Sequence, residues 1–205
     1  MTGAPRTRDV MLREAARLFA ERGFRGTAVS DIGAACGTSG PAVYKHFASK
    51  DALLARLLVD ISEQLVTGAR EVLAAHPGAD RALVALVEFH TDFALAEPDV
   101  IRVQDRDLAS LNERDRRVVR RLQRSYVELW TDVLCRLYGG LDLEVARVRA
   151  HAVFGLLNST PHSARGRGEA RRQLIGMALR ALTHDAVSAP DERHHLVPRS
   201  ADVRP

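Results

Sequence analysis

Apolar residues recur at intervals of three and four along almost the whole of this 205-residue chain. This spacing places them on one face of a helix, and after residue 78 no strand-like alternation interrupts it. Glycines and prolines divide the pattern into segments of helical length. The chain is therefore predicted to be all-α. Besides a short helix after Ser39, helices are expected over residues 8–22, 28–36, 50–75, 80–97, 99–108, 112–138, 143–159 and 169–184.

Three short helical segments fill the first quarter of the chain. Thr27 and Ser39 stand where the second and third would be capped, and Ser49 caps the long helix that follows. Gly37 ends the second segment, and Pro41 falls in the first turn of the third, where its missing N–H is tolerated. Two short helices joined by a tight glycine turn predict a helix-turn-helix, whose outer helix enters the DNA major groove.

The third helix is expected to turn Val43 and Phe47 inward and to present small, aromatic and cationic side chains outward. Small residues allow close approach to base edges, while cationic and hydroxyl groups bind phosphates. The charge distribution agrees, because residues 1–50 hold eight basic and four acidic residues, while the whole chain has a net charge of +4. The remainder is therefore neutral, and a basic head on a neutral body is typical of a DNA-binding protein.

The sequence lacks the signals that mark several other classes of protein. No apolar run approaches the roughly 18 residues of a membrane span, and the N-terminus lacks the apolar segment of a secretory signal, so we predict a cytoplasmic protein that binds no membrane. The two cysteines, Cys36 and Cys135, have no metal-type spacing and are expected to be reduced thiols. Without a Gly-rich phosphate loop, HExxH, GxSxG or CxxC, we expect no enzyme, no catalytic residue, no metal and no cofactor.

A specific motif covers the predicted helix-turn-helix. Residues 32–53 read IGAACGTSGPAVYKHFASKDAL, which is similar to the pattern I-A-x-x-A-G-V-S-x-G-x-x-Y-x-H-F-x-S-K-x-x-L of the TetR family of transcriptional regulators. The chain departs from it at Gly33, Cys36, Thr38 and Pro41. Gly33 is expected to loosen the second helix, because a mid-helix glycine costs about 1 kcal/mol relative to alanine.

This resemblance implies DNA contacts, mainly to phosphates, with Gly40 and Ala42 facing the bases. The complete set of implied DNA-binding residues is Thr27, Thr38, Ser39, Gly40, Ala42, Tyr44, Lys45, His46 and Lys50. Helix capping alone is an alternative role for Thr27 and Ser39, and packing on the protein surface is one for His46.

The resemblance also divides the chain into a DNA-binding domain over 1–50, running into a linker helix over 50–75, and a ligand-binding and dimerisation domain over 51–184. Residues 185–205 are predicted to be a disordered tail. The last two helices carry more apolar surface than exposed helices should, which favours a four-helix bundle between two subunits over packing within one. The expected interface residues are Val145, Val148, Ala152, Leu156, Leu174, Ile175, Ala178, Leu179 and Leu182.

A ligand pocket should combine apolar walls with a few polar groups. The candidates are aromatic or polar residues on helical faces, with the core as the alternative place for each: Phe89, His90, Phe93, Arg106, Tyr126, Trp130, Phe154 and Asn158. The segment 101–123 and the residues after it are rich in arginine, which predicts either a solvated face or a site for an anionic ligand. The arrangement also resembles TetR-like regulators of actinobacterial lipid and acyl-CoA metabolism, which implies an anionic or lipid-like effector.

The function implied by these features is that of a homodimeric repressor, which a small-molecule effector releases from a palindromic operator in double-stranded DNA. A non-sensing architectural DNA-binding protein is the alternative. Such a protein would need no large apolar body.

Overall fold

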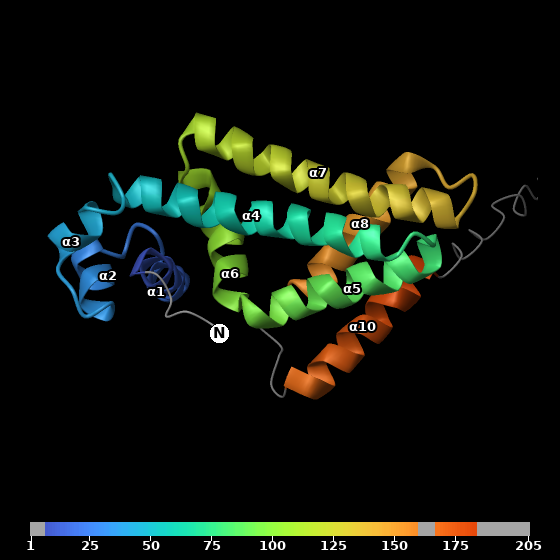
Figure 1. Cartoon of the computed structure of the whole chain (residues 1–205), viewed down its shortest axis with the longest axis horizontal. Coiled ribbons are helices and arrows are strands. Elements are labelled where there is room, and N and C mark those ends of the chain that lie inside the picture. The colour runs from blue at the N-terminus through green and yellow to red at the C-terminus, as the bar shows by residue number, and fades with distance from the viewer. Residues whose placement is uncertain (1–6, 160–166, 184–205) are drawn as a thin grey trace, which may run out of the picture.

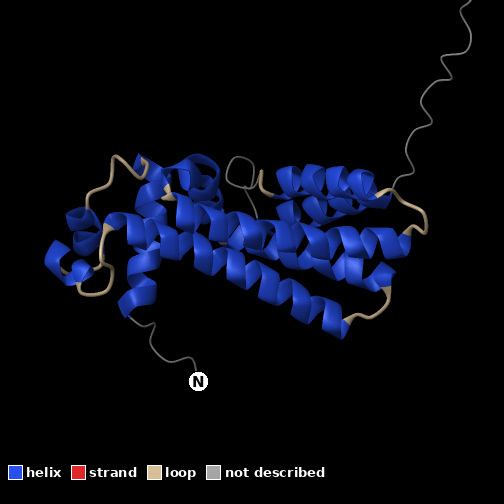
Figure 2. Ribbon diagram, turned by 90° about the horizontal axis from the view of Figure 1, so that it is seen from above, coloured by secondary structure: helices blue, strands red, loops and turns tan. Residues whose placement is uncertain are grey.

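The computed structural model describes residues 7–159 and 167–183, and within these ranges every regular element is a helix (Figure 2). The all-α prediction is confirmed. The predicted tail over 185–205 lies outside the described residues.

A small head lies at one end of an elongated body (Figure 1). Its elements are α1 (Thr7–Arg22), α2 (Val29–Ala35) and α3 (Gly40–Tyr44). The body contains α4 (Lys50–Ala75), α5 (Ala79–Ala96), α6 (Pro98–Asp107), the 3-10 turn η1 (Leu108–Ser110), α7 (Glu113–Leu137), α8 (Leu143–Leu157) and α10 (Arg167–Thr183). In Figure 1, α4 runs from the head along the body beside α7, and α6 connects the end of α5 to the region next to the head.

Two apolar cores are present, and α4 contributes to both. The first joins the head to the beginning of α4 and to α6, with Phe19, Leu53 and Val103 fully buried. The second joins the rest of α4 to α5, α7, α8 and α10, with Trp130 and Leu182 fully buried. The first core therefore extends beyond residue 50, where the sequence placed the domain boundary, because the head alone cannot bury the apolar faces of its short helices.

Thr27 and Lys50 stabilise the turn between α1 and α2. The Thr27 side chain is buried, and its single hydroxyl proton is shared between the carbonyls of Leu18 (3.2 Å) and Gly23 (2.9 Å). The Lys50 ammonium donates to the carbonyls of Phe24 (2.8 Å) and Thr27 (2.9 Å) and lies 4.5 Å from the centre of the Phe24 ring. Thr27 and Lys50 therefore stabilise the head through these hydrogen bonds.

The helix caps differ from the predicted ones at α2. Ala28 occupies its N-cap, and the Asp31 carboxylate accepts from the Ala28 backbone N–H at 3.0 Å. Ser39 occupies the N-cap of α3 without a side-chain hydrogen bond. Ser49 does cap α4, since its hydroxyl accepts from the Ala52 N–H at 3.0 Å.

Gly33 lies where α2 closely approaches the start of α3. A Cβ at this position would lie 2.7 Å from the carbonyl carbon of Ser39 and 2.8 Å from the nitrogen of Gly40. The Gly33 carbonyl also accepts from the Thr38 N–H at 2.8 Å, which closes the turn between the two helices. The glycine that was expected to loosen α2 therefore permits the helix-turn-helix to close.

We predict that Gly33→Ala lowers the stability of the protein by about 1–3 kcal/mol, because the added methyl group meets backbone atoms that have no rotamer to escape into. The control is Ala34→Gly at the exposed neighbouring position, which should cost about 1 kcal/mol through helix propensity alone. Urea denaturation followed by circular dichroism measures both. A Gly33→Ala protein more stable than the parent would show that helix propensity outweighs the contact.

Candidate functional site

The outward face of α3 carries side chains that the sequence assigned to DNA. Val43 and Phe47 are buried, which turns the opposite side of the segment to solvent. Tyr44 is 53% exposed, and Lys45 and His46 are exposed beside it. An aromatic hydroxyl and two nitrogen groups therefore project from the end of α3 and the turn that follows it.

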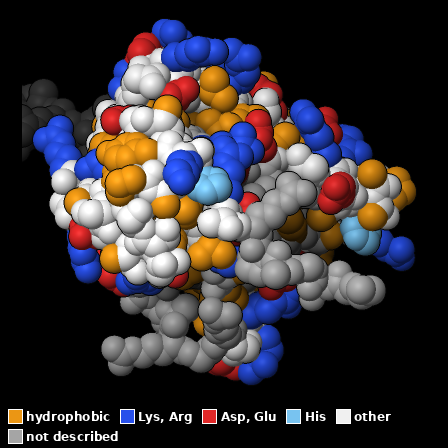
Figure 3. Space-filling view, turned by 60° about the vertical axis from the view of Figure 1, so that its left-hand side comes forward, with side chains coloured by type: hydrophobic (Ala, Val, Ile, Leu, Met, Phe, Trp, Pro, Cys, Tyr) orange, Lys and Arg blue, Asp and Glu red, His pale blue; other side chains and the backbone are white. Residues whose placement is uncertain are grey.

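The beginning of α3 is open as well. Ser39 is exposed, and Thr38, Gly40 and Ala42 are partly exposed. Figure 3, which brings the head end of the molecule forward, shows more Lys and Arg than Asp and Glu side chains on this side. Eight of the nine implied DNA-binding residues are thus exposed or partly exposed, and Thr27 is the one that is buried.

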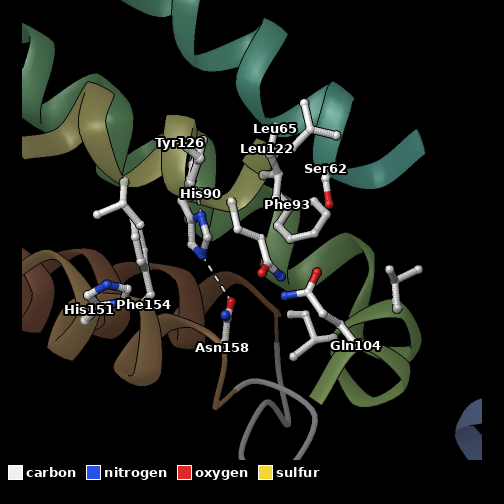
Figure 4. Close-up of a pocket in the computed structure, with 14 residues that line it drawn as sticks. Ser62, Leu65, His90, Phe93, Gln104, Leu122, Tyr126, His151, Phe154 and Asn158 are labelled. Atoms are coloured by element: carbon white, nitrogen blue, oxygen red, sulfur yellow. Dashed lines mark hydrogen bonds between the residues drawn. The ribbon is translucent and has the colours of Figure 1, made fainter. Parts of the chain in front are cut away.

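A cavity of about 270 Å³ lies in the body, between α4, α5, α6, α7 and α8 (Figure 4). Aliphatic and aromatic side chains form most of its wall, and hydroxyl, amide and imidazole groups interrupt it. The residues that line it are Ser62, Leu65, His90, Phe93, Val100, Ile101, Gln104, Leu122, Gln123, Tyr126, Val127, His151, Phe154 and Asn158.

His90 connects three helices through this wall. Its Nδ1 lies 2.9 Å from the Tyr126 hydroxyl, and its Nε2 lies 3.0 Å from Oδ1 of Asn158. The imidazole also packs against the rings of Phe154 and Phe93, with centroids 5.0 and 5.8 Å away. Figure 4 shows His90 between Tyr126 and Asn158, with Phe154 beside it.

Burial lowers the pKa of His90 to about 4, and the hydrogen bond to Asn158 opposes that shift only in part. The imidazole is therefore neutral near pH 7 and carries one N–H. Because the amide oxygen of Asn158 can only accept, that N–H is on Nε2, and Nδ1 accepts from the Tyr126 hydroxyl. Burial raises the pKa of Tyr126, so its hydroxyl keeps the proton it donates.

The polar groups of the cavity are thus uncharged donors and acceptors. Among the described residues, no Asp, Glu, Lys or Arg side chain lines it. A charged group entering it would lose its hydration without meeting an opposite charge. The cavity is suited to a compact, uncharged and largely apolar group.

Five of the eight predicted pocket residues line the cavity: His90, Phe93, Tyr126, Phe154 and Asn158. Trp130 is fully buried behind the wall, with its ring centroid 5.0 Å from that of Phe154. Phe89 packs on α4 at Gly68, where a Cβ would lie 2.4 Å from its ring. The two aromatic residues therefore belong to the core, which was their alternative place.

Arg106 points away from the cavity and contacts the head. Its guanidinium donates to the carbonyls of Phe19 and Ala20 at the C-terminal end of α1, and it also pairs with the buried Asp107 at 2.9 Å. A cation at the C-terminus of a helix is favoured by the helix dipole. Arg106 thus links α6 to α1 and contributes nothing to the predicted pocket.

Sequence reasoning missed the contributions of α4 and α6 and four polar lining residues: Ser62, Gln104, Gln123 and His151. The sequence carries only a weak signal for these residues, because a glutamine on an amphipathic helix is ordinarily expected to face solvent. Which faces line a cavity depends on how five helices converge.

The predicted interface residues fall into two groups. Val145 and Val148 on α8 are 43% and 67% exposed, Ala152 is exposed next to them, and Leu156, Ile175 and Leu179 are partly exposed. Leu174, Ala178 and Leu182 are instead buried in the core of their own subunit. For these three, packing within the subunit is the role that the structure supports.

None of the described helices has the length and apolar character that a membrane crossing requires. In residues 7–159 and 167–183, no three His, Cys, Asp or Glu side chains are grouped in a way that could hold a metal ion.

Comparisons with protein families match both halves of the chain. Residues 11–57 match the description "Bacterial regulatory proteins, tetR family", and residues 76–186 match "Tetracyclin repressor-like, C-terminal domain". The chain is 31% identical over 134 residues to the HTH-type transcriptional repressor KstR2 of Rhodococcus jostii (strain RHA1), an alignment that covers 65% of this chain and 66% of that protein. The chain therefore spans slightly less than two thirds of this relative.

Solved structures share the fold. A TetR-family transcriptional regulator from Bordetella parapertussis has a TM-score of 0.77 at 23% identity, over 86% of this chain and 95% of that one. AibR, solved in complex with isovaleryl coenzyme A and operator DNA, has a TM-score of 0.67 at 19% identity, over 83% of this chain and 97% of that one.

We predict that the stability of the protein decreases as the pH falls from 6.5 to about 4, because the unfolded His90 takes up a proton that the folded site rejects. His90 should contribute up to about 1.4 kcal/mol per pH unit to this loss of stability, and the contribution should disappear in His90→Gln. Urea denaturation at several pH values measures it, with His151→Gln, at an exposed position, as the control. Parallel pH profiles for the parent and His90→Gln would contradict a neutral buried imidazole.

Proposed function

Because the chain belongs to the TetR family of bacterial transcriptional regulators, with matches over both its head and its body, we propose that it is a homodimeric repressor that a small-molecule effector releases from a palindromic operator. The observation that carries this proposal is the shared position of α4 and α6. Both helices line the cavity, and both belong to the core of the head.

On this proposal the head binds DNA through the open face of α3. Tyr44, Lys45 and His46 donate to phosphates, while Gly40 and Ala42 allow the helix to approach base edges. Thr38 and Ser39 contribute hydroxyls at the start of the helix. The protein acts in the cytoplasm, where bacterial DNA is found.

Dimerisation uses the exposed apolar side of α8 together with α10. Val145, Val148 and Met177 are all exposed in the single subunit, and burial against a second copy removes this apolar surface from water. A palindromic operator presents half-sites about 34–36 Å apart or a multiple of that distance, which a two-fold symmetric pair of heads can match.

Coupling between cavity and head follows from the contacts of α6. Val100, Ile101 and Gln104 face the cavity, while Arg106, less than one turn beyond Gln104, holds the carbonyls at the end of α1. A ligand that displaces α6 therefore acts on the head directly. The dimer can adopt a head separation that fits the operator and one that does not. An effector that binds the second state more tightly lowers the affinity for DNA, by a factor set by the ratio of its affinities for the two states.

The effector class that we propose is a thioester of coenzyme A. AibR, which shares this fold, was solved with isovaleryl coenzyme A. A short acyl group suits the uncharged cavity of about 270 Å³, which is slightly below the usual range of about 300–1,000 Å³ for ligand pockets.

Selection from a random DNA pool tests the proposal. The full-length protein should enrich a palindromic motif, and a short-chain coenzyme A thioester should release that DNA in a mobility-shift assay. Enrichment of no motif, under conditions where the protein binds DNA in general, would favour a non-sensing architectural DNA-binding protein.

Two lysines in the head should respond differently to mutation. Lys45→Ala should reduce the slope of log affinity against log salt by about one, because one phosphate contact is lost. Lys50→Ala should mainly lower the melting temperature, because two carbonyls lose their donor. Fluorescence anisotropy at several salt concentrations and thermal unfolding measure the two effects. A Lys50→Ala protein with unchanged melting temperature and a smaller salt slope would assign Lys50 to a phosphate.

A further inference from the structure

A second hollow lies next to the cavity, on the surface between α7 and α8. Gln123, Val127 and His151 line both spaces, so the two adjoin along one wall. The second hollow has a volume of about 570 Å³. We call it the basic hollow, and its remaining lining residues are Arg120, Arg124, Glu128 and Arg147.

The cavity and the basic hollow differ in the charge of their walls. The cavity has no charged lining residue among those described, whereas the basic hollow has three guanidinium groups and one carboxylate. Arg120 and Arg124 lie one turn apart on α7, and Arg147 faces them from α8. The hollow therefore carries a net positive charge next to an uncharged opening.

Arg120 and Arg124 differ from Arg116, Arg117 and Arg136 of the same helix in their partners. Arg116 and Arg117 pair with Glu113, and Arg136 pairs with Asp132. No described carboxylate lies within ion-pair distance of Arg120 or Arg124, although both are exposed on the same helix. Arg147 pairs with Glu144 on its own helix. Two guanidinium forks thus remain available to a ligand, and a third needs only to exchange an exposed partner.

We propose that the effector is an amphipathic anion, which places a compact uncharged group in the cavity and its phosphate groups in the basic hollow against Arg120, Arg124 and Arg147. This proposal rests on the effector-binding function proposed above and adds the site of charge recognition. Several forks on two helices suit a ligand with more than one phosphate, because each fork can bind two oxygen atoms. Glu128 offsets one of the three positive charges and leaves the hollow net positive.

The position of this anion site explains how one ligand can contain both a charge and an apolar group. The charged part stays at the exposed end, where solvent and guanidinium groups replace its lost hydration. The uncharged part enters the cavity beyond Gln123 and His151 and reaches the polar groups of His90 and Asn158. Binding therefore ties α7 and α8 to the helices that contact the head.

Paired ligands that share an acyl group test the proposal. Calorimetry on the full-length protein should compare short-chain coenzyme A thioesters with the matching N-acetylcysteamine thioesters, which lack phosphates, and with coenzyme A alone. For each acyl group, we expect the coenzyme A thioester to bind about tenfold or more tightly than the matching N-acetylcysteamine thioester. This is the size of effect expected for charge-assisted hydrogen bonds to the phosphates.

The variant Arg120→Gln/Arg124→Gln should remove most of this advantage, since Arg147 is the one proposed contact left. It should leave the affinity for the N-acetylcysteamine thioester unchanged, which also shows that the cavity is intact. Arg121→Gln is the matched control, since Arg121 is exposed on the same helix and lines neither space. An undiminished advantage in the double variant, or equal binding of both thioesters by the parent protein, would overturn the proposal.

Failure here is distinguishable from failure of the regulatory function. If uncharged ligands alone bind and release a selected palindrome, the anion site is wrong and the repressor proposal stands. If coenzyme A thioesters bind through Arg120 and Arg124 but no specific DNA is enriched, the repressor proposal is wrong and the anion site stands.

Discussion

Burial of a single apolar stripe along α4 is the constraint on which the rest of the structure depends. Leu53 and Leu58 in the first half of this helix are buried with the head, and Val66 and Ala69 further along are buried with the body. A helix of 26 residues is about 39 Å long and stiff over that length. The head therefore has no separate core that would let it move independently. Its position follows from α4 together with α6, which reaches α1 through Arg106.

The polar groups of the cavity are arranged around one neutral histidine. Both ring nitrogens of His90 have partners, and the surroundings are apolar and aromatic, so a proton on this ring is disfavoured. Such a site can exchange hydrogen bonds with an uncharged ligand, but it offers no counter-charge. Recognition of charge therefore falls to the surface between α7 and α8, where water reduces the cost of holding several arginines close together.

Helix boundaries were predictable because they depend on local chemistry. Ser49 caps α4 through its own hydroxyl, and the glycine and proline breaks lie where the helices end. The motif at residues 32–53 also located the helix-turn-helix. It did not show that Lys50 folds back onto carbonyls of the head, because a motif records a residue type and not the direction of its side chain. Gly33 was misread for a similar reason, since helix propensity takes no account of a neighbouring helix at contact distance.

The sequence by itself determined the all-α class, the order of the helices, the family and five of the aromatic and polar residues of the cavity wall. Only the tertiary structure decided that His90, Tyr126 and Asn158 share one chain of hydrogen bonds while Trp130 lies behind them, and that Leu182 is buried in its own subunit while Val148 is exposed. The physical reason is that periodicity identifies an apolar face but not its partner. A large aromatic or aliphatic residue suits a core, a cavity wall or an interface equally well. The way in which several helices pack together decides which of these three places it occupies.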